Sequence, residues 1–447
     1  MAQAATFDVN RFIDEQKIGT FHYILIIVSF LTVMVDGYDI GAAAFAAPAL
    51  VKEWHLNRAQ LGPMFSAGLF AGLFGPPVLG WVADHYGRRL AVISGVVFFG
   101  IFTLASVWAT SIEQMIYLRF IAGLGISGVL AIVVSLNIEY APRRLRATLF
   151  VIMFSGVTFG GGVPGLIASR WMESEGWQIL FWIGGIAPLV VAALLFFVLP
   201  ESAKFLTLKP ERHGELVRLL ARLNPAHSPP AQARFILQGE TAVTKFAVKN
   251  LFVGKLAIIT PLFWVTNAVN LMIFYFVNQW MPTLLANAGV PISQAVLATT
   301  LFQFGGTVGG LVIMRPLDKF GFIPVPILFA CAIPIIACIG LNGLSQNVVL
   351  ALVTLAGFCL LGLQFGNIAS ESNVYPTAIR SFGVGMCFGA GRVGSVIGPL
   401  VGGWLIGMQV SLQQLFFIAA IPLLLGLIAA IALTPMYYAQ YHKLTGK

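Results

Sequence analysis

Charged residues are scarce in this chain of 447 residues. Asp, Glu, Lys and Arg together make up 10% of it, whereas soluble globular proteins contain roughly 25%. So few charges cannot cover a surface that faces water, and hydrophobic residues reach 58%. The composition therefore excludes a soluble globular fold and indicates an integral membrane protein.

Residue types that usually carry catalysis or bind metals are also sparse. None of the six histidines lies deep in an apolar run. The four cysteines show no CxxC spacing and lie in apolar runs, where a small buried side chain is the expected role: Cys331, Cys338, Cys359 and Cys387. No nucleophile–base pair, metal cluster or phosphate-binding loop stands out. We expect no enzymatic activity, no cofactor and no metal.

Long apolar runs occur throughout the chain. A run of about 20 apolar residues is long enough to cross a bilayer as a helix. We expect an all-α membrane protein with twelve transmembrane helices, near residues 21–48, 61–82, 90–109, 114–138, 147–169, 177–199, 256–284, 294–314, 323–343, 347–372, 381–406 and 412–435.

The formal net charge of +9 arises from basic residues in the short gaps between apolar runs. If the N-terminus is cytosolic, 21 of the 26 Lys and Arg residues fall on the cytosolic side, and only Lys52, Arg58 and Arg170 fall on the other. This bias predicts a multi-pass protein of a bacterial-type inner membrane with both termini in the cytosol. It also argues against a nucleic-acid partner.

The largest gap between apolar runs divides the chain into two halves. We expect an N-terminal six-helix half at 1–199, a cytosolic linker at 200–255 and a C-terminal six-helix half at 256–447. Within the linker, residues 211–223 place four leucines on one helical face with charged residues around them. That pattern predicts a helix lying on the inner membrane surface, ended by the proline-containing stretch 224–231.

The two halves are related by an internal repeat. Many residues recur after a constant offset of 234, so one gapless register relates the halves; the pairs include Asp84/Asp318, Gly87/Gly321, Pro142/Pro376, Arg146/Arg380, Pro48/Pro282 and Gly72/Gly306. Because the offset spans an even number of helices, both halves have the same orientation. This arrangement is typical of transporters built from parallel repeats.

Several motifs resemble those of a known family. Gly80–Arg89, Arg119–Gly123 and Pro200–Ser202 resemble motifs of the major facilitator superfamily. The sequence Asp36-Gly37-Tyr38-Asp39 is similar to an element of its aromatic acid:proton symporter branch, as are Tyr375–Arg380 and Gly391–Gly394. The resemblance covers nearly the whole chain. It implies the major facilitator fold and transport of a small aromatic carboxylate with a proton.

Four charged residues lie inside predicted spans: Asp36, Asp39, Arg119 and Arg392. A charge at the bilayer centre costs about 2.5–3.5 kcal/mol on insertion scales and usually serves function. All four break the repeat, because Asn270, Ile273, Val353 and Thr158 occupy the matching positions. Asp36 and Asp39 share a helix face at the depth of Arg119. Since neighbouring carboxylates disfavour joint ionisation, we expect this pair to carry the coupled proton; the alternative is a static ion-pair cluster that orients two helices.

Arg392 lies near the middle of span eleven among glycines, which allow close approach of a ligand. Its guanidinium suits a substrate carboxylate, although helix-end carbonyls could satisfy it instead. Arg119 is a second candidate for substrate binding, or it only pairs with the acids. Amides and rings on spans seven, eight and ten complete the predicted substrate site: Asn270, Phe274, Tyr275, Gln303 and Gln364.

Charged residues also gather at the predicted cytosolic ends of the spans. We expect them to form a gate that opens and closes, with static anchoring at the interface as the alternative: Asp84, Arg88, Arg89, Glu139, Arg146, Asp318, Glu371 and Arg380. An acid and an arginine recur in each half. The second copy of the Gly80–Arg89 motif lacks the arginine pair, so its side of the gate is held differently.

The predicted function is proton-coupled uptake of a small aromatic carboxylate, of the benzoate or hydroxybenzoate type, by alternating access. The aromatic class follows from the resemblance alone, whereas the residues indicate a small anion with a proton. A non-aromatic organic acid, proton-driven efflux and a non-transporting receptor are the alternatives. We expect the partners to be the substrate, protons and membrane lipid, and the protein to be a monomer.

Overall fold

The computed structural model describes residues 6–142, 145–224, 233–237, 248–287, 292–341, 343–376 and 379–445. Several residues used in the prediction lie outside these ranges. They are Arg143, Arg144 and Lys447 of the basic-residue pattern, Thr377 and Ala378 of the second-half motif, and the proline-containing stretch at 225–231.

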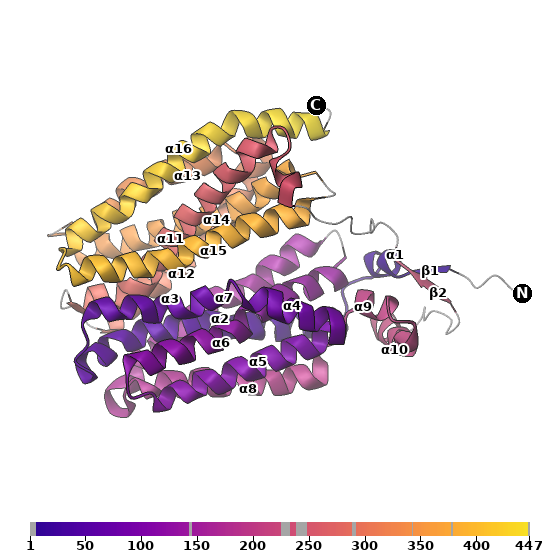
Figure 1. The fold of residues 1–447 in the computed structure, drawn as a ribbon, viewed down its shortest axis with the longest axis horizontal. Coiled ribbons are helices and arrows are strands. Elements are labelled where there is room, and N and C mark those ends of the chain that lie inside the picture. The colour runs from indigo at the N-terminus through magenta and orange to yellow at the C-terminus, as the bar shows by residue number, and fades with distance from the viewer. Residues whose placement is uncertain are drawn as a thin grey trace, which may run out of the picture.

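Long helices dominate the described residues (Figure 1). Eleven are long and apolar enough to cross a membrane, and α13 is a shorter apolar helix, which together make the predicted twelve. The first half contains α2 (Thr20–Glu53), α3 (Leu61–Ala71) with α4 (Gly75–Tyr86), α5 (Arg88–Ala105), α6 (Ile112–Tyr140), α7 (Arg146–Glu175) and α8 (Gln178–Val198). The second contains α11 (Leu256–Asn287), α12 (Ile292–Phe320), α13 (Pro324–Ile339), α14 (Gln346–Val374), α15 (Arg380–Gly407) and α16 (Leu412–Thr445).

The helix boundaries follow the sequence repeat. An offset of 234 carries both ends of α6 onto both ends of α14, and the first residues of α7 and α8 onto those of α15 and α16. Packing repeats as well, since α2 packs on α7 as α11 packs on α15, and α5 packs on α8 as α13 packs on α16. The halves meet through α3 with α15, α7 with α12, and α2 with α11. The repeat relates α3 to α12 and α15 to α7, so it converts the first of these contacts into the second. The interface is therefore pseudo-symmetric.

The second span is interrupted, whereas its counterpart in the second half is one continuous helix. The second span divides into α3 and α4 around Gly72–Phe74, whereas α12 runs unbroken. Pro76 and Pro77 follow the break, and the matching residues are Gly310 and Leu311. Because proline lacks an N–H and fits only the first turn of a helix, the two prolines start a new helix here.

The halves are in contact at the end away from the termini. There Ser66 Oγ donates to the carbonyl of Val396 at 2.8 Å, and a Cβ on Gly62 would lie 3.0 Å from the carbonyl of Pro399. At the end of the molecule that carries both termini (Figure 1), Gly80 on α4 and Gly385 on α15 have open space where a Cβ would stand. The halves are therefore closely packed at the end away from the termini, whereas these two glycines face open space at the other end.

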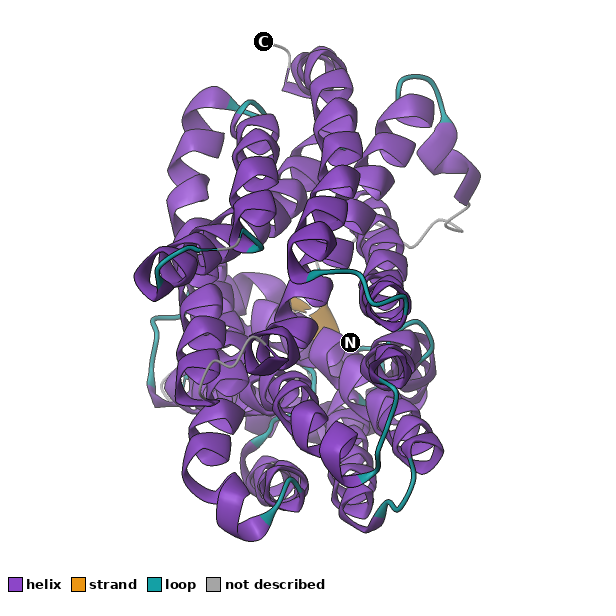
Figure 2. Ribbon diagram, turned by 90° about the vertical axis from the view of Figure 1, so that its left-hand side faces the viewer, coloured by secondary structure: helices purple, strands orange, loops and turns teal. Residues whose placement is uncertain are grey.

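A small module forms at the end that carries the termini. Strand β1 (Thr6–Asp8) pairs in parallel with β2 (Arg234–Ile236), and short helices α1 (Val9–Asp14), α9 (Ala203–Thr207) and α10 (His213–Leu223) surround them. The prediction that α10 lies with its leucines on the membrane surface is wrong. Leu216 and Leu220 are fully buried in one core with Val9 and Phe235, because the N-terminal segment folds back and covers them. Viewed end-on, the module lies beyond the helices at the far end of the molecule (Figure 2).

Candidate functional site

Four consecutive residues of α2, Asp36 to Asp39, face different neighbours. A Cβ on Gly37 would overlap the backbone of Val157 on α7, so only glycine allows this helix contact. Tyr38 donates its hydroxyl to the carbonyl of Leu180 on α8 at 2.9 Å. Asp39 points to α6, and Asp36 lies toward the interface between the halves. The motif thus joins α2 to three helices of its own half, while the carboxylate of Asp36 has no hydrogen bond or ion pair with the residues that the structure describes.

Asp39 and Arg119 form a buried ion pair. Both guanidinium Nη atoms contact the carboxylate, Nη2 to Oδ2 at 2.8 Å and Nη1 to Oδ1. Arg119 is 5% exposed and Asp39 is 7% exposed. Such a bidentate pair fixes geometry as well as charge. The sequence predicted that Arg119 lies near both acids, but its fork is occupied by Asp39 in this structure and is not available to a carboxylate ligand.

Asp36 faces Arg392 across the interface. The two charges, one from each half, lie within electrostatic range of each other and of Tyr275. Among the described residues neither forms a hydrogen bond or an ion pair through its side chain; Arg392 lies over the ring of Phe388 at 5.1 Å. A Cβ on Gly72 would lie 3.2 Å from Arg392 Nη1. The helix break in the first half therefore lies beside the guanidinium of the second.

Two pairs of amide side chains are hydrogen-bonded within the second half. Asn270 Nδ2 donates to Gln364 Oε1 at 3.1 Å, and Gln303 Nε2 donates to Asn278 Oδ1 at 3.3 Å. The remaining polar atoms Asn270 Oδ1 and Gln364 Nε2 are buried and find no partner among the described residues. A buried polar atom without a partner is costly, so this pair offers one acceptor and one donor to a ligand.

Phe274 and Gln303 line a cavity between α7 and α12. Its volume is about 50 Å³, room for a few waters and well below the 300–1,000 Å³ typical of small-molecule pockets. A hydrogen bond of 2.8 Å between Thr158 and Thr307 crosses the interface beside it. This cavity cannot hold an aromatic acid in this conformation.

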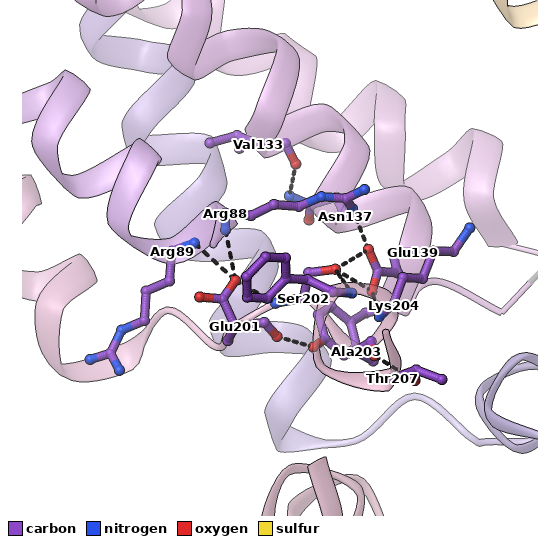
Figure 3. A network of polar contacts seen from close by, with 12 residues as sticks. Arg88, Arg89, Val133, Asn137, Glu139, Glu201, Ser202, Ala203, Lys204 and Thr207 are labelled. Atoms are coloured by element: carbon purple, nitrogen blue, oxygen red, sulfur yellow. Dashed lines mark hydrogen bonds and ion pairs between the residues drawn. The ribbon is translucent and has the colours of Figure 1, made fainter. Parts of the chain in front are cut away.

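At the end that carries the termini, Glu139 is the centre of a polar network (Figure 3). Its carboxylate pairs with Arg88, accepts from Ser202 Oγ at 2.9 Å and accepts from the backbone N–H of Lys204 at 2.7 Å. Glu139 is 5% exposed. The network joins α6, the start of α5 and the chain that follows α8.

Glu201 holds the first turn of α5. Its Oε1 accepts from the backbone N–H groups of Arg88 at 2.8 Å and Arg89 at 3.2 Å. A carboxylate at a helix N-terminus satisfies free N–H groups and suits the helix dipole. The sequence motif included Glu201 and Ser202 but did not indicate this role, because the backbone partners of Glu201 lie more than a hundred residues away in the chain.

The arginines that recur in the two halves, Arg146 and Arg380, contact equivalent positions at helix ends. Arg146 Nε donates to the carbonyl of Ala141, and Arg380 Nε donates to that of Tyr375. These contacts are related by the repeat, and each places a cation at the C-terminal end of α6 or α14, where carbonyls lack helix partners. Arg146 also pairs with Asp14 of the N-terminal helix at 3.5 Å.

The remaining predicted gate residues are not joined to one another. Glu371 is 1% exposed and accepts from Asn267 Nδ2 at 2.6 Å. No cation within the described ranges pairs with it, because Asn137 and not Glu139 is its counterpart in the repeat. Asp84 and Asp318 are exposed and form no ion pair with a described residue.

Comparison with known proteins identifies the family to which this chain is related. The model of the Major Facilitator Superfamily matches residues 29–370 and 263–446. The 4-hydroxybenzoate transporter PcaK of Pseudomonas aeruginosa is 34% identical over 426 residues, covering 95% of each chain. The gallate transporter of Pseudomonas putida is 31% identical, covering 96% of this chain and 95% of its own. The benzoate transport protein of Acinetobacter baylyi is also 31% identical, covering 94% and 91%.

Solved structures share the fold. The inward-open xylose transporter XylE of E. coli superposes with a TM-score of 0.69 at 18% identity, covering 92% of this chain and 95% of its own. A bacterial Spinster homologue in an inward-facing, unoccupied state gives 0.65 at 16% identity, covering 96% and 99%. The repeat, the twelve helices and these matches agree. The chain belongs to the Major Facilitator Superfamily, a family of membrane transporters, and is not an enzyme.

Proposed function

We propose that this protein carries a small aromatic carboxylate into the cell together with a proton. The relatives are named for transport of 4-hydroxybenzoate, gallate and benzoate, all benzene rings with a carboxylate. The observation that carries the proposal is Arg392, a cation at the interface of the halves without a carboxylate partner among the described residues. Its planar fork is complementary to a carboxylate.

The substrate is held from the second half. Its carboxylate binds Arg392, its ring lies against Phe274 and Tyr275, and a ring hydroxyl reaches the unpaired atoms of Asn270 and Gln364. Gln303 contributes a further polar contact. Arg119 positions Asp39 instead of binding substrate. These contacts require the cavity beside Phe274 to widen as the halves move.

Asp36 carries the coupled proton. It faces Arg392, so arrival of a substrate anion at Arg392 weakens the attraction that keeps Asp36 ionised. Asp36 then takes up a proton, and substrate plus proton add no net charge to the site. Asp39 supports the coupling through its fixed pair with Arg119. A neutral loaded site crosses the membrane interior at lower cost.

The halves at 1–199 and 256–447 rock about this site, joined by the linker at 200–255. With both termini in the cytosol of a bacterial-type inner membrane, the interface here is closed to the outside, which corresponds to an inward-facing state. The gate on the cytosolic side comprises the pair Arg88–Glu139, the exposed Asp84 and Asp318, and Arg89, Arg146, Glu371 and Arg380. Neither Asp84 nor Asp318 forms an ion pair with a described residue, as expected for an open gate.

Uptake into proteoliposomes tests the proposal. With an inside-alkaline gradient, labelled 4-hydroxybenzoate or benzoate should accumulate, and a protonophore should abolish accumulation. A saturated aliphatic acid of similar size should compete poorly. Accumulation only with the opposite gradient would indicate efflux, binding without flux would indicate a receptor, and equal competition by the aliphatic acid would remove the aromatic assignment.

A further inference from the structure

A second cavity lies apart from the transport site, where α8 ends and the linker begins. Its volume is about 350 Å³. Four elements line it: the end of α8 with the residues that follow it (197–201), the start of α5, α9 through Leu206, and one face of α10. It is thus formed between two spans of the first half and the small module of β1, β2, α1, α9 and α10.

One wall of the cavity is apolar and lies at the end of a membrane span. Phe197 is 80% exposed and Phe196, on the same helix end, is 57% exposed. In a chain that crosses the membrane, side chains of this kind at the end of a span face lipid. The cavity therefore opens at the boundary between the acyl chains and the headgroups of the leaflet on the side of the termini.

The other wall carries positive charge. Arg218 and Arg222 are exposed on α10 one turn apart, and Arg89 projects from α5. The guanidinium of Arg89 donates to the carbonyl of Phe196 and lies 5.6 Å from the centre of its ring. Cations at this depth, beside exposed aromatic rings, are typical of proteins that bind lipid headgroups.

The two acids in the cavity are already engaged. Glu201 accepts backbone N–H groups at the start of α5, and Glu215 pairs with Arg212 at 2.7 Å. The pKa of Glu215 lies below its usual value, first because Arg212 donates a hydrogen bond to it and further because Arg218 and Arg89 are near. Arg218 and Arg222 form no ion pair with a described residue. Two cations thus remain for an anion that enters the cavity.

We propose that this cavity is a binding site for the phosphate headgroup of an anionic phospholipid. The phosphodiester contacts Arg218 and Arg222, and the acyl chains lie along Phe196 and Phe197. The apolar wall favours a lipid over a free phosphate. Because α10 belongs to the linker between the halves, a bound lipid fixes the module to the first half.

Native mass spectrometry of the full-length protein in neutral detergent tests this site. Phosphatidylglycerol and phosphatidylcholine with identical acyl chains are titrated against the parent and against Arg218→Ala/Arg222→Ala. The parent should retain phosphatidylglycerol preferentially. The double variant should bind it about 30-fold more weakly, as expected for two arginines at a membrane surface. Arg218→Lys/Arg222→Lys keeps the charge and should retain most of the binding.

Arg315→Ala/Lys319→Ala is the matched control, since it removes two exposed cations of the second half and should leave lipid binding unchanged. A soluble glycerol phosphate serves as competitor for a free-phosphate site. Unchanged binding by Arg218→Ala/Arg222→Ala, equal retention of both lipids by the parent, or complete displacement by millimolar glycerol phosphate would each overturn the proposal. The thermal transition of every variant shows whether it is folded.

Discussion

The two halves of this protein share their helices but not their charges. Under one offset, helix ends coincide to the residue at α6 and α14, and arginines bind the equivalent carbonyls of Ala141 and Tyr375. Inside the membrane the first half contains Asp36, Asp39 and Arg119, whereas the second contains amides and Arg392. Features that occur twice build the scaffold. Those that occur once are therefore the candidates for binding an asymmetric ligand and a proton.

The charged residues that occur in only one half of the repeat also differ from one another. The pair of Asp39 with Arg119 lies within one half, and both guanidinium Nη atoms of Arg119 contact the carboxylate of Asp39. Asp36 and Arg392 come from opposite halves and form no hydrogen bond through their side chains to described residues. The first pair is suited to hold α2 and α6 together in every state. The second can change partners as the halves move, which is what coupling requires.

The largest expected effect comes from breaking the buried pair of Asp39 with Arg119. Arg119→Ala leaves the carboxylate of Asp39 buried without a cation and should lower the free energy of unfolding by about 3–5 kcal/mol. Asp39→Asn combined with Arg119→Gln removes both charges and should recover much of that loss. Chemical unfolding in detergent measures the cycle. Additive losses would show that the two residues do not act as a pair.

Coupling should depend on the other acid. Asp36→Asn cannot release a proton, so accumulation driven by a proton gradient should be lost. Exchange of labelled for unlabelled substrate at equal pH should persist, and the free energy of unfolding should change by less than about 1 kcal/mol, as is usual away from buried pairs. Full accumulation by this variant would exclude Asp36 as the proton carrier. Asp39→Asn should lose accumulation together with stability, which distinguishes the two acids.

A smaller effect is expected at the helix break. The added Cβ of Gly72→Ala would approach Arg392 Nη1 at 3.2 Å and the carbonyl of Leu69 at 2.8 Å. Overpacking of this kind costs about 1 kcal/mol or more, so substrate affinity should fall roughly fivefold. Gly80→Ala is the control, since its Cβ meets open space. Equal affinity of both variants in calorimetric titration would place Gly72 away from the site.

The sequence predicted the scaffold well because its signals are strong and local. Apolar runs and a constant offset of 234 gave twelve helices in two copies, which the helix boundaries confirm. It did not predict that α10 would bury Leu216 and Leu220 inside the protein. An amphipathic helix is equally suited to a membrane surface and to a protein core. Here the pairing of β1 with β2 brings the N-terminal segment to α10, and this contact favours the protein core.

The sequence indicated candidate residues for the site but not how they pair. Breaks in the repeat singled out Asp36, Asp39, Arg119 and Arg392 as candidates. The repeat could not show that Arg119 would pair with Asp39 and not with Asp36, since a spacing of three predicts both acids on one helix face at similar depth. The sequence likewise did not indicate that Glu139 would pair with Arg88. Which acid pairs with which arginine depends on how neighbouring helices are rotated about their axes, and the sequence carries no local signal for that rotation.

Binding of the substrate carboxylate by Arg392 is the central contact of the proposed function. Isothermal titration calorimetry of 4-hydroxybenzoate and its amide against the parent, Arg392→Lys and Arg392→Ala measures this contact. For the acid, affinity should fall clearly in Arg392→Lys, which loses the planar fork, and by about 2–5 kcal/mol in Arg392→Ala. The amide should bind weakly to all three. Equal affinity of the parent and Arg392→Ala for the acid would contradict the assignment.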